Sequence, residues 1–204
     1  MITIIDSDIA NIGSVIAAYR RLGIATTTTT DPKTVATATA LVLPGVGAFA
    51  DGMESLRHKD LVQPILDAAA AGVPILGICL GMQLLAEVSE EFGEHPGLGL
   101  IPGRVMPLQP VQANERVPNI GWCDVTLKPE SPLFASMGSV ETFYFVHSYS
   151  LNCTNSQHAI GTMPFGATPV TVAVAHKNVF GVQFHPEKSQ DAGLKLLYSF
   201  SLRI

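Results

Sequence analysis

Apolar positions along the first half of the chain follow two alternating patterns. Short apolar or β-branched runs predict strands, and apolar residues at helical spacing between them predict helices. Proline and glycine mark several ends, as Pro44 does for the third strand and Gly72 for the third helix. The predicted strands are Ile2–Ile5, Ile24–Thr30, Ala40–Leu43 and Val73–Ile78, and the predicted helices are Asn11–Leu22, a short helix opened by Asp31-Pro32, Leu61–Ala71 and about Leu80–Glu87.

The second half has a different pattern, in which closely spaced strands are separated by turn residues. These strands are Arg104–Leu108, Trp122–Leu127, Thr142–Leu151, Ala159–Met163 and Val170–His176, followed by a buried strand at Val179–Phe184 and a closing helix at Ala192–Leu202. The first half predicts βαβ units, and the second predicts an antiparallel extension. The expected fold is therefore α/β, with an open, mainly parallel sheet covered by helices on both faces and extended by antiparallel strands. No linker or repeat interrupts residues 1–204, so we expect a single domain.

Composition and charge restrict the possible functions. The formal net charge is −5, and no cluster of Lys and Arg provides the basic surface that nucleic-acid binding needs. No apolar run reaches membrane-spanning length, and the N-terminal residues lack the basic region of a signal peptide. Three cysteines without paired spacing favour a reduced, cytoplasmic protein. Charged residues make up only 14% of the chain, which fits either an apolar docking patch or a compact monomer.

A cysteine flanked by two glycines follows the fourth predicted strand. In Gly77-Ile78-Cys79-Leu80-Gly81, an apolar strand runs into Gly-x-Cys-x-Gly, and a helix follows. This is the pattern of a nucleophile elbow, in which the central residue lies on a sharp turn at a helix N-terminus. The partial positive charge there stabilises a thiolate. Most lone cysteines are simply packed in a core, and we assign that role to Cys123 and Cys153, but the two glycines favour Cys79 as a nucleophile.

A histidine and a glutamate follow the last predicted strand. A thiolate nucleophile needs an imidazole as acid and base, and the imidazole needs an acceptor that fixes its tautomer. His185 and Glu187 are separated by Pro186, and in an extended chain they project to the same side. In isolation a His-Pro-Glu segment is more often a solvated loop. His147 is interpreted as a pocket-wall or structural histidine, and no pair of residues shows zinc-ligand spacing.

A glycine-rich turn follows the third predicted strand. Acyl transfer needs backbone N–H donors aimed at the developing oxyanion. The N–H of Leu80, directly after the nucleophile, is one expected donor, and the N–H of Val46 is the second, because Gly45 lets that peptide reorient. An ordinary strand-exit turn is the commoner explanation of such a sequence. A phosphate loop is weaker still, because no Lys-Ser/Thr follows.

Taken together, these segments resemble the class I glutamine amidotransferases, whose catalytic set is Cys-His-Glu on an open α/β sheet. Within that class the sequence is most similar to the glutaminase subunits of imidazole glycerol phosphate synthase, from histidine biosynthesis. The similarity runs from Asn11 to the C-terminal helix. It is carried by Pro44–Phe49, Gly77–Leu85, Val117–Trp122, Tyr144–Tyr149 and Gly181–Ser189.

The resemblance implies hydrolysis of glutamine to glutamate and ammonia through a cysteine thioester, without a cofactor or metal. It implies a separate barrel-type cyclase subunit that receives the ammonia through a tunnel. The residues implied to hold glutamine are Gly47, Gln83, Glu91, Ser148 and Tyr149, and those implied to face the partner are Asn11, Trp122 and Lys188. The sequence departs from the family pattern at Asp6–Ala10, which lacks the usual Tyr and Gly, and at Asn119 and Cys123, which replace the commoner His and Asn.

Two other functions remain open at this point. The first keeps the chemistry and changes the partner to a chorismate-using synthase, but the glutaminase components of anthranilate and aminodeoxychorismate synthases have a different turn from Pro44–Phe49. A non-catalytic α/β module that has kept the scaffold is the second alternative. The presence of Cys79, His185 and Glu187 together argues against it.

Overall fold

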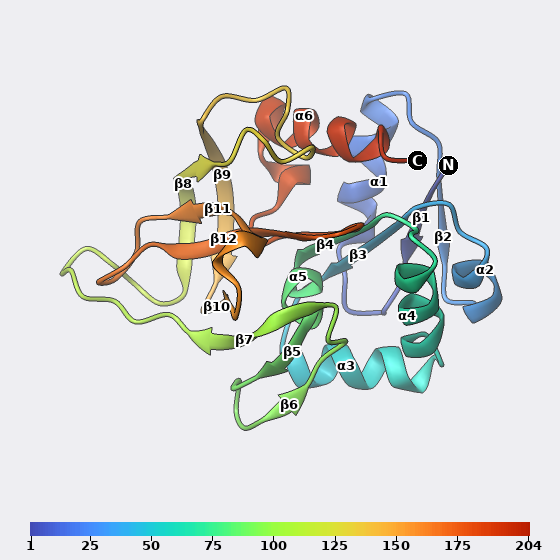
Figure 1. Cartoon of the computed structure of the whole chain (residues 1–204), viewed down its shortest axis with the longest axis horizontal. Helices are drawn as coiled ribbons and strands as arrows, with labels where there is room; N and C mark the ends of the chain where they lie inside the picture. The colour runs from blue at the N-terminus through green and yellow to red at the C-terminus, as the bar shows by residue number, and fades with distance from the viewer.

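A nine-stranded sheet forms the centre of the molecule. The computed structural model describes residues 1–204. The strand order across the sheet is β2-β1-β3-β4-β13-β12-β11-β8-β9 (Figure 1). The strands are β1 (Ile2–Ile5), β2 (Thr26–Thr29), β3 (Leu41–Gly45), β4 (Ile75–Cys79), β8 (Asn119–Leu127), β9 (Val140–His147), β11 (Ala159–Met163), β12 (Val170–His176) and β13 (Val179–Val182).

The first five strands in this order are parallel, as the alternation of strands and helices predicted. Both faces of β1, β3, β4 and β13 are buried because helices cover both, whereas the edge strand β2 is only partly buried. Successive residues of β3 and β4 alternate between the two cores: Val42 and Leu76 belong to one, and Leu41 and Ile75 belong to the other. The first core includes α1 (Ile12–Arg21) and α6 (Gln190–Ser201), and the second includes α3 (Phe49–His58), α4 (Val62–Ala70) and α5 (Leu80–Leu84). The remaining helix, α2 (Pro32–Ala36), packs against α4.

The last four strands are antiparallel, which confirms the predicted extension. The outermost pair, β8 and β9, has eight residue pairs in register, from Asn119 opposite His147 to Thr126 opposite Val140. Single 3₁₀ turns lie at Ser156–His158 and Pro186–Lys188. None of the helices combines the length and the apolar character that crossing a bilayer would require.

A second, four-stranded sheet was not predicted from the sequence. Its order is β10-β7-β5-β6, with β10 at Tyr149–Cys153, β7 at Ile101–Pro107, β5 at Ala86–Ser89 and β6 at His95–Pro96. In Figure 1 it lies below the central sheet, next to α3. Because β5 pairs with β7, residues 86–89 are drawn into this sheet. The predicted helix Leu80–Glu87 therefore ends at Leu84.

Two further predictions need correction, and one helix was not predicted. Strand β3 does not stop at Pro44 but continues to Gly45, because Pro44 and Gly45 stay in register with Ile78 and Cys79 of β4. The predicted strand Thr142–Leu151 is two strands, β9 and β10, which separate at Ser148 into different sheets. Helix α3 was missed, although Phe49, Met53 and Leu56 are its buried residues and have helical spacing.

Candidate active site

Cys79 lies at the junction between the central strand β4 and helix α5. Its backbone has φ 56° and ψ −113°, a strained conformation for a residue other than glycine. The two flanking glycines allow the junction to be tight. A Cβ at Gly77 would come within 2.6 Å of the Gly81 carbonyl oxygen, and a Cβ at Gly81 would overlap the Leu43 carbonyl oxygen. The sequence pattern therefore gave the right local structure, because only glycine fits at both positions.

His185 and Glu187 follow β13, the parallel neighbour of β4. The Nδ1 atom of His185 lies 2.8 Å from Oε1 of Glu187, and both side chains are buried. Burial lowers the pKa of the imidazole, but the neighbouring Cys79 thiol and the Glu187 carboxylate together raise it more strongly, to about 9. The backbone is held as well, since the Ser189 hydroxyl donates to the His185 carbonyl oxygen at 2.7 Å. The imidazole is thus oriented and favoured in its protonated form near neutral pH.

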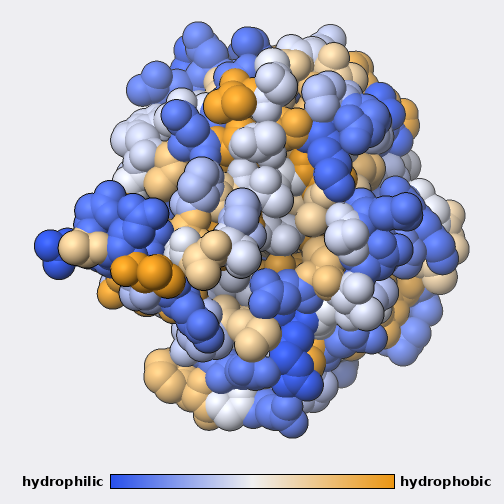
Figure 2. All heavy atoms as spheres, turned by 60° about the vertical axis from the view of Figure 1, so that its left-hand side comes forward, coloured by the Kyte–Doolittle hydropathy of each residue, from blue (hydrophilic) through white to orange (hydrophobic).

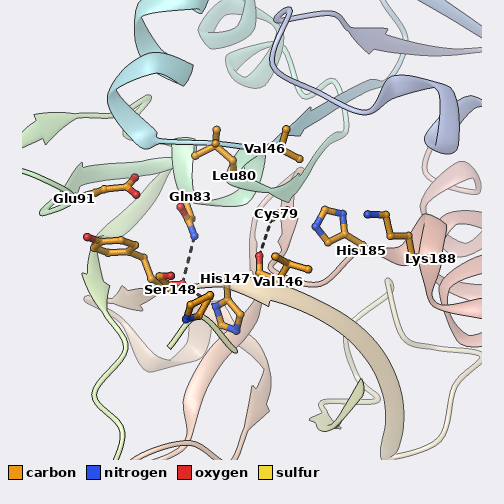
Figure 3. Close-up of a pocket in the computed structure, with 13 residues that line it drawn as sticks. Val46, Cys79, Leu80, Gln83, Glu91, Val146, His147, Ser148, His185 and Lys188 are labelled. Atoms are coloured by element: carbon orange, nitrogen blue, oxygen red, sulfur yellow. Dashed lines mark hydrogen bonds between the residues drawn. The ribbon is translucent and has the colours of Figure 1, made fainter. Parts of the chain in front are cut away.

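The thiol of Cys79 and the ring of His185 open into the same cavity. This cavity has a volume of about 300 Å³, within the range of small-ligand sites. Figure 3 shows His185 and Lys188 to the right of Cys79, and Gln83 and Glu91 to the left. The Cys79 Sγ donates to the Val146 carbonyl oxygen at 3.8 Å. The lining residues are Val46, Gly47, Cys79, Leu80, Gln83, Glu91, Pro118, Val146, His147, Ser148, Tyr149, His185 and Lys188.

The two predicted oxyanion donors, the N–H groups of Leu80 and Val46, differ in whether they already have a hydrogen-bond acceptor. Leu80 is the first residue of α5, where backbone N–H groups have no acceptor within the helix. Val46 also lines the cavity, but its N–H donates to the Ile9 carbonyl oxygen at 2.7 Å. This donor is therefore occupied, by the segment that departs from the family pattern. Next to it, Gly47 has φ +96°, which side chains other than glycine rarely adopt.

All five residues expected to hold glutamine line the cavity. The Gln83 amide nitrogen donates to the Gln183 side chain at 2.9 Å and to the Tyr149 carbonyl oxygen at 3.4 Å, so its oxygen is left for the cavity. Glu91 reaches the first residue of α3, because its Oε2 accepts from the Phe49 N–H at 2.6 Å. Its second oxygen remains for a ligand. Gln183 itself is fully buried and was not predicted to belong to the site.

The residues expected to face a partner lie at two places. Lys188 lines the cavity, with its Nζ 5.9 Å from the centre of the Tyr144 ring. Trp122 is half exposed and packs edge-on against the same ring at 5.7 Å. Asn11 does not line the cavity; it is exposed and precedes α1.

Asn119 and Cys123, the two departures on β8, face away from the exposed side of that strand. Ile120 and Trp122 are exposed, whereas Asn119 and Cys123 alternate with them and are partly buried. The Asn119 amide nitrogen lies 3.1 Å from His147 Nε2 and 3.7 Å from Met163 Sδ. Asn119 and Cys123 therefore alter the partly buried side of β8 and not its exposed side. Burial lowers the pKa of His147 to about 4, and the His185 charge adds to this effect, so His147 is neutral. No three His, Cys, Asp or Glu side chains are arranged to hold a metal ion.

Comparison with known proteins agrees with this geometry. A model of the family "Glutamine amidotransferase class-I" matches residues 3–203. The chain belongs to the class-I glutamine amidotransferase family. The expected enzyme class is therefore confirmed, which disfavours the non-catalytic alternative.

Curated relatives of this amidotransferase carry the name of one synthase subunit. The imidazole glycerol phosphate synthase subunit HisH of Sulfurimonas denitrificans is 47% identical over 98% of this chain and 97% of its own length. The corresponding subunit of Salinibacter ruber is 44% identical over 98% of this chain and 94% of its own length. A solved glutamine amidotransferase has the same fold, with a TM-score of 0.77 at 19% identity over 99% of this chain and 97% of that one. The α/β fold class is confirmed.

Proposed function

We propose that this amidotransferase is the glutaminase subunit of an imidazole glycerol phosphate synthase and that it delivers ammonia to a barrel-type cyclase subunit. The observation that carries the proposal is that Cys79 and His185 line one cavity, while Glu187 holds the His185 ring from behind at 2.8 Å. The near full-length similarity to subunits of that synthase supports the choice of partner. The family model spans 3–203, which supports a single amidotransferase domain.

The proposed reaction begins when the Cys79 thiolate attacks the side-chain amide carbon of glutamine. The C–N bond then breaks, and the His185 imidazolium gives its proton to the departing nitrogen, so that ammonia leaves and a thioester remains. The neutral imidazole next takes a proton from water, and the hydroxide oxygen attacks the thioester carbon. The C–S bond breaks, which releases glutamate and restores the thiolate and imidazolium. Glu187 holds the ring through its 2.8 Å contact with Nδ1 throughout both steps.

The oxyanion of each tetrahedral intermediate needs backbone donors. We assign the N–H of Leu80 as the first donor, because it follows the nucleophile at the start of α5. The N–H of Val46 becomes the second only after it leaves the Ile9 carbonyl oxygen. A rotation of the Gly45–Val46 peptide would supply this change, so the site as it stands has one donor ready and one withheld.

The surface beside the cavity supports a protein partner. Ile120 lies opposite Val146, and Trp122 lies opposite Tyr144, so these four side chains share the outer face of β8 and β9. Ile120, Trp122 and Val146 are exposed, and Val146 also lines the cavity. On the face shown in Figure 2, apolar residues occur in small groups among polar ones, as at many transient or mixed interfaces. A partner seated on β8 and β9 would cover the cavity and keep ammonia from water.

The direct test is glutamine turnover by the Cys79→Ala variant in complex with the cyclase. We expect turnover to fall by at least about a thousandfold, because the nucleophile is lost. Cys123→Ala is the matched control and should keep wild-type turnover, because its thiol does not line the cavity. Near wild-type turnover by Cys79→Ala would remove Cys79 from the mechanism. If the chain binds a chorismate-using enzyme and no cyclase, the choice of partner is wrong.

A further inference from the structure

Gln183 is a fully buried polar residue that the proposed reaction does not yet use. It follows β13 and precedes Phe184 and His185, and its side chain lies behind the cavity rather than in its wall. Burying an amide is unfavourable unless its donors and acceptor are paired. Its nitrogen Nε2 lies 3.8 Å from the Cys79 sulfur, and its oxygen Oε1 accepts from Gln83 at 2.9 Å.

The direction of the Gln183 amide follows from a backbone carbonyl of known polarity. The Tyr149 carbonyl oxygen can only accept, so the Gln83 group 3.4 Å from it must be the NH₂ group. That same NH₂ also contacts Gln183 at 2.9 Å, so the atom of Gln183 facing it must be the oxygen. The NH₂ group of Gln183 is therefore turned toward the Cys79 sulfur. An inverted Gln183 amide would place two donors against each other and an oxygen against the sulfur.

A second hydrogen bond to the Tyr149 carbonyl oxygen, from His147, helps to fix the position of this oxygen. His147 Nδ1 lies 2.9 Å from it, and because the oxygen accepts, Nδ1 carries the proton. The other ring nitrogen, Nε2, then accepts from the Asn119 amide at 3.1 Å. His147 is neutral, which this pairing requires. Each amide and ring in the set has only one orientation that satisfies its neighbours.

We propose that Gln183 is a positioning residue for the nucleophile: its side-chain N–H, fixed by Gln83, stabilises the Cys79 thiolate and aims it at the cavity. This rests on the proposed function, in which that thiolate attacks glutamine. The Val146 carbonyl oxygen, which accepts from the neutral thiol at 3.8 Å, cannot stabilise the thiolate. The Gln183 N–H can, and a hydrogen bond to a charged acceptor is about twice as strong as one between neutral groups.

The test compares Gln183→Met and Gln183→Glu with wild type. Methionine keeps the length of the side chain but has no donor. Glutamate keeps the oxygen that Gln83 binds but places a second acceptor against the sulfur. The pH dependence of Cys79 alkylation by iodoacetamide is followed in the full chain by mass spectrometry of the Cys79 peptide, so that Cys123 and Cys153 do not interfere.

In the Gln183→Met variant we expect the pH midpoint of Cys79 alkylation to rise by about one unit, which makes alkylation about tenfold slower below the midpoint. The Glu variant should shift it further. Glutamine turnover by the cyclase complex should fall about tenfold through kcat, with KM nearly unchanged. Ser199→Ala is the control, because it removes a partly buried hydrogen bond to Ser136, and neither residue lines the cavity, so it should lower stability without moving the midpoint.

An unchanged midpoint in folded Gln183→Met and Gln183→Glu variants would overturn the assignment. Thermal unfolding of each variant shows whether it is folded. If Gln183→Met does not fold, the isosteric Glu variant alone decides, since it keeps the contact with Gln83. This failure is distinct from a failure of the proposed function, which would appear as retained turnover by Cys79→Ala.

Discussion

The two sides of the cavity differ in how far they are prepared for catalysis. The prepared side holds Cys79, His185 and Glu187, and the withheld side is the turn at Val46 and Gly47. On the nucleophile side, Cys79 ends β4, and His185 and Glu187 follow its parallel neighbour β13. All three side chains are buried, and the imidazole is already paired with Glu187 at 2.8 Å. On the oxyanion side, Val46 is exposed, and its N–H donates to Ile9 instead of the cavity. Under the proposed mechanism, the nucleophile and its base are assembled in the free chain, while one of the two proposed oxyanion donors is withheld. In that mechanism, such an arrangement would slow ammonia release until a change reaches the Gly45–Val46 peptide.

The largest loss of glutamine turnover is expected from Glu187→Gln, which removes the carboxylate that pairs with His185 on the prepared side. Glutamine replaces an ionised acceptor, so the ring loses charge stabilisation, and turnover in the cyclase complex should fall by about a hundredfold or more. Glu141→Gln is the control, because Glu141 is a partly exposed residue of β9 that does not line the cavity. A fall of less than a few-fold would contradict the role given to Glu187.

The same variant has a pH signature. The His185 pKa of about 9 lies above the unfolded value of about 6.5. A raised pKa of this kind contributes stability that is fully present below about pH 6.5 and is lost as the pH rises through about 9. The difference in the free energy of unfolding between wild type and Glu187→Gln should therefore shrink as the pH rises from 6.5 to 9. A difference that stays constant over this range would show that Glu187 does not act through the His185 charge.

Gly81→Ala tests the rigidity of the prepared side. A Cβ at this position would overlap the Leu43 carbonyl oxygen, so β3 and α5 would have to separate. We expect the free energy of unfolding to fall by about 3 kcal/mol or more, measured by chemical denaturation. Gly13→Ala is a matched control, because its nearest neighbour would be 4.0 Å from the new Cβ and it lies on helix α1. Equal stability of the two variants would mean that the elbow tolerates expansion.

Much of the prepared side could be predicted from the sequence because its signals are local. Gly77, Cys79 and Gly81 specify the elbow within five residues, and His185 and Glu187 are two apart. The parallel order was also predictable, since each buried run is followed by a helical pattern. The neighbouring strands β4 and β13 then bring the two motifs together, although about a hundred residues separate them.

The withheld side and the supporting network could not be predicted in the same way. The bond from Val46 to Ile9 joins two loops, and no periodic pattern reports such a contact. Gln183 lies within the predicted strand Val179–Phe184, where a polar residue has no distinguishing spacing. The second sheet could not be predicted because β5 and β6 are only four and two residues long. In addition, the pairing of β5 with β7 overrides the helical pattern that precedes β5.

The smallest expected effect comes from Gly47→Ala, which acts on the withheld side alone. With φ at +96° and no atom within 4 Å of the new Cβ, the variant is strained but meets no clash, and should lose about 1 kcal/mol of stability. Gly23→Ala is closely matched, with φ +71° and equally open space at the end of α1. Both variants should lose similar stability, but only Gly47→Ala should lower glutamine turnover, by a few-fold, because Gly47 lines the cavity and directly follows Val46 in the turn that must rearrange when the Val46 N–H leaves Ile9. Cys79 alkylation should stay at the wild-type rate in both variants, since the nucleophile side is untouched. Equal turnover by the two variants would mean that the Val46 peptide does not move during catalysis, and the contrast between the two sides would then describe the resting structure only.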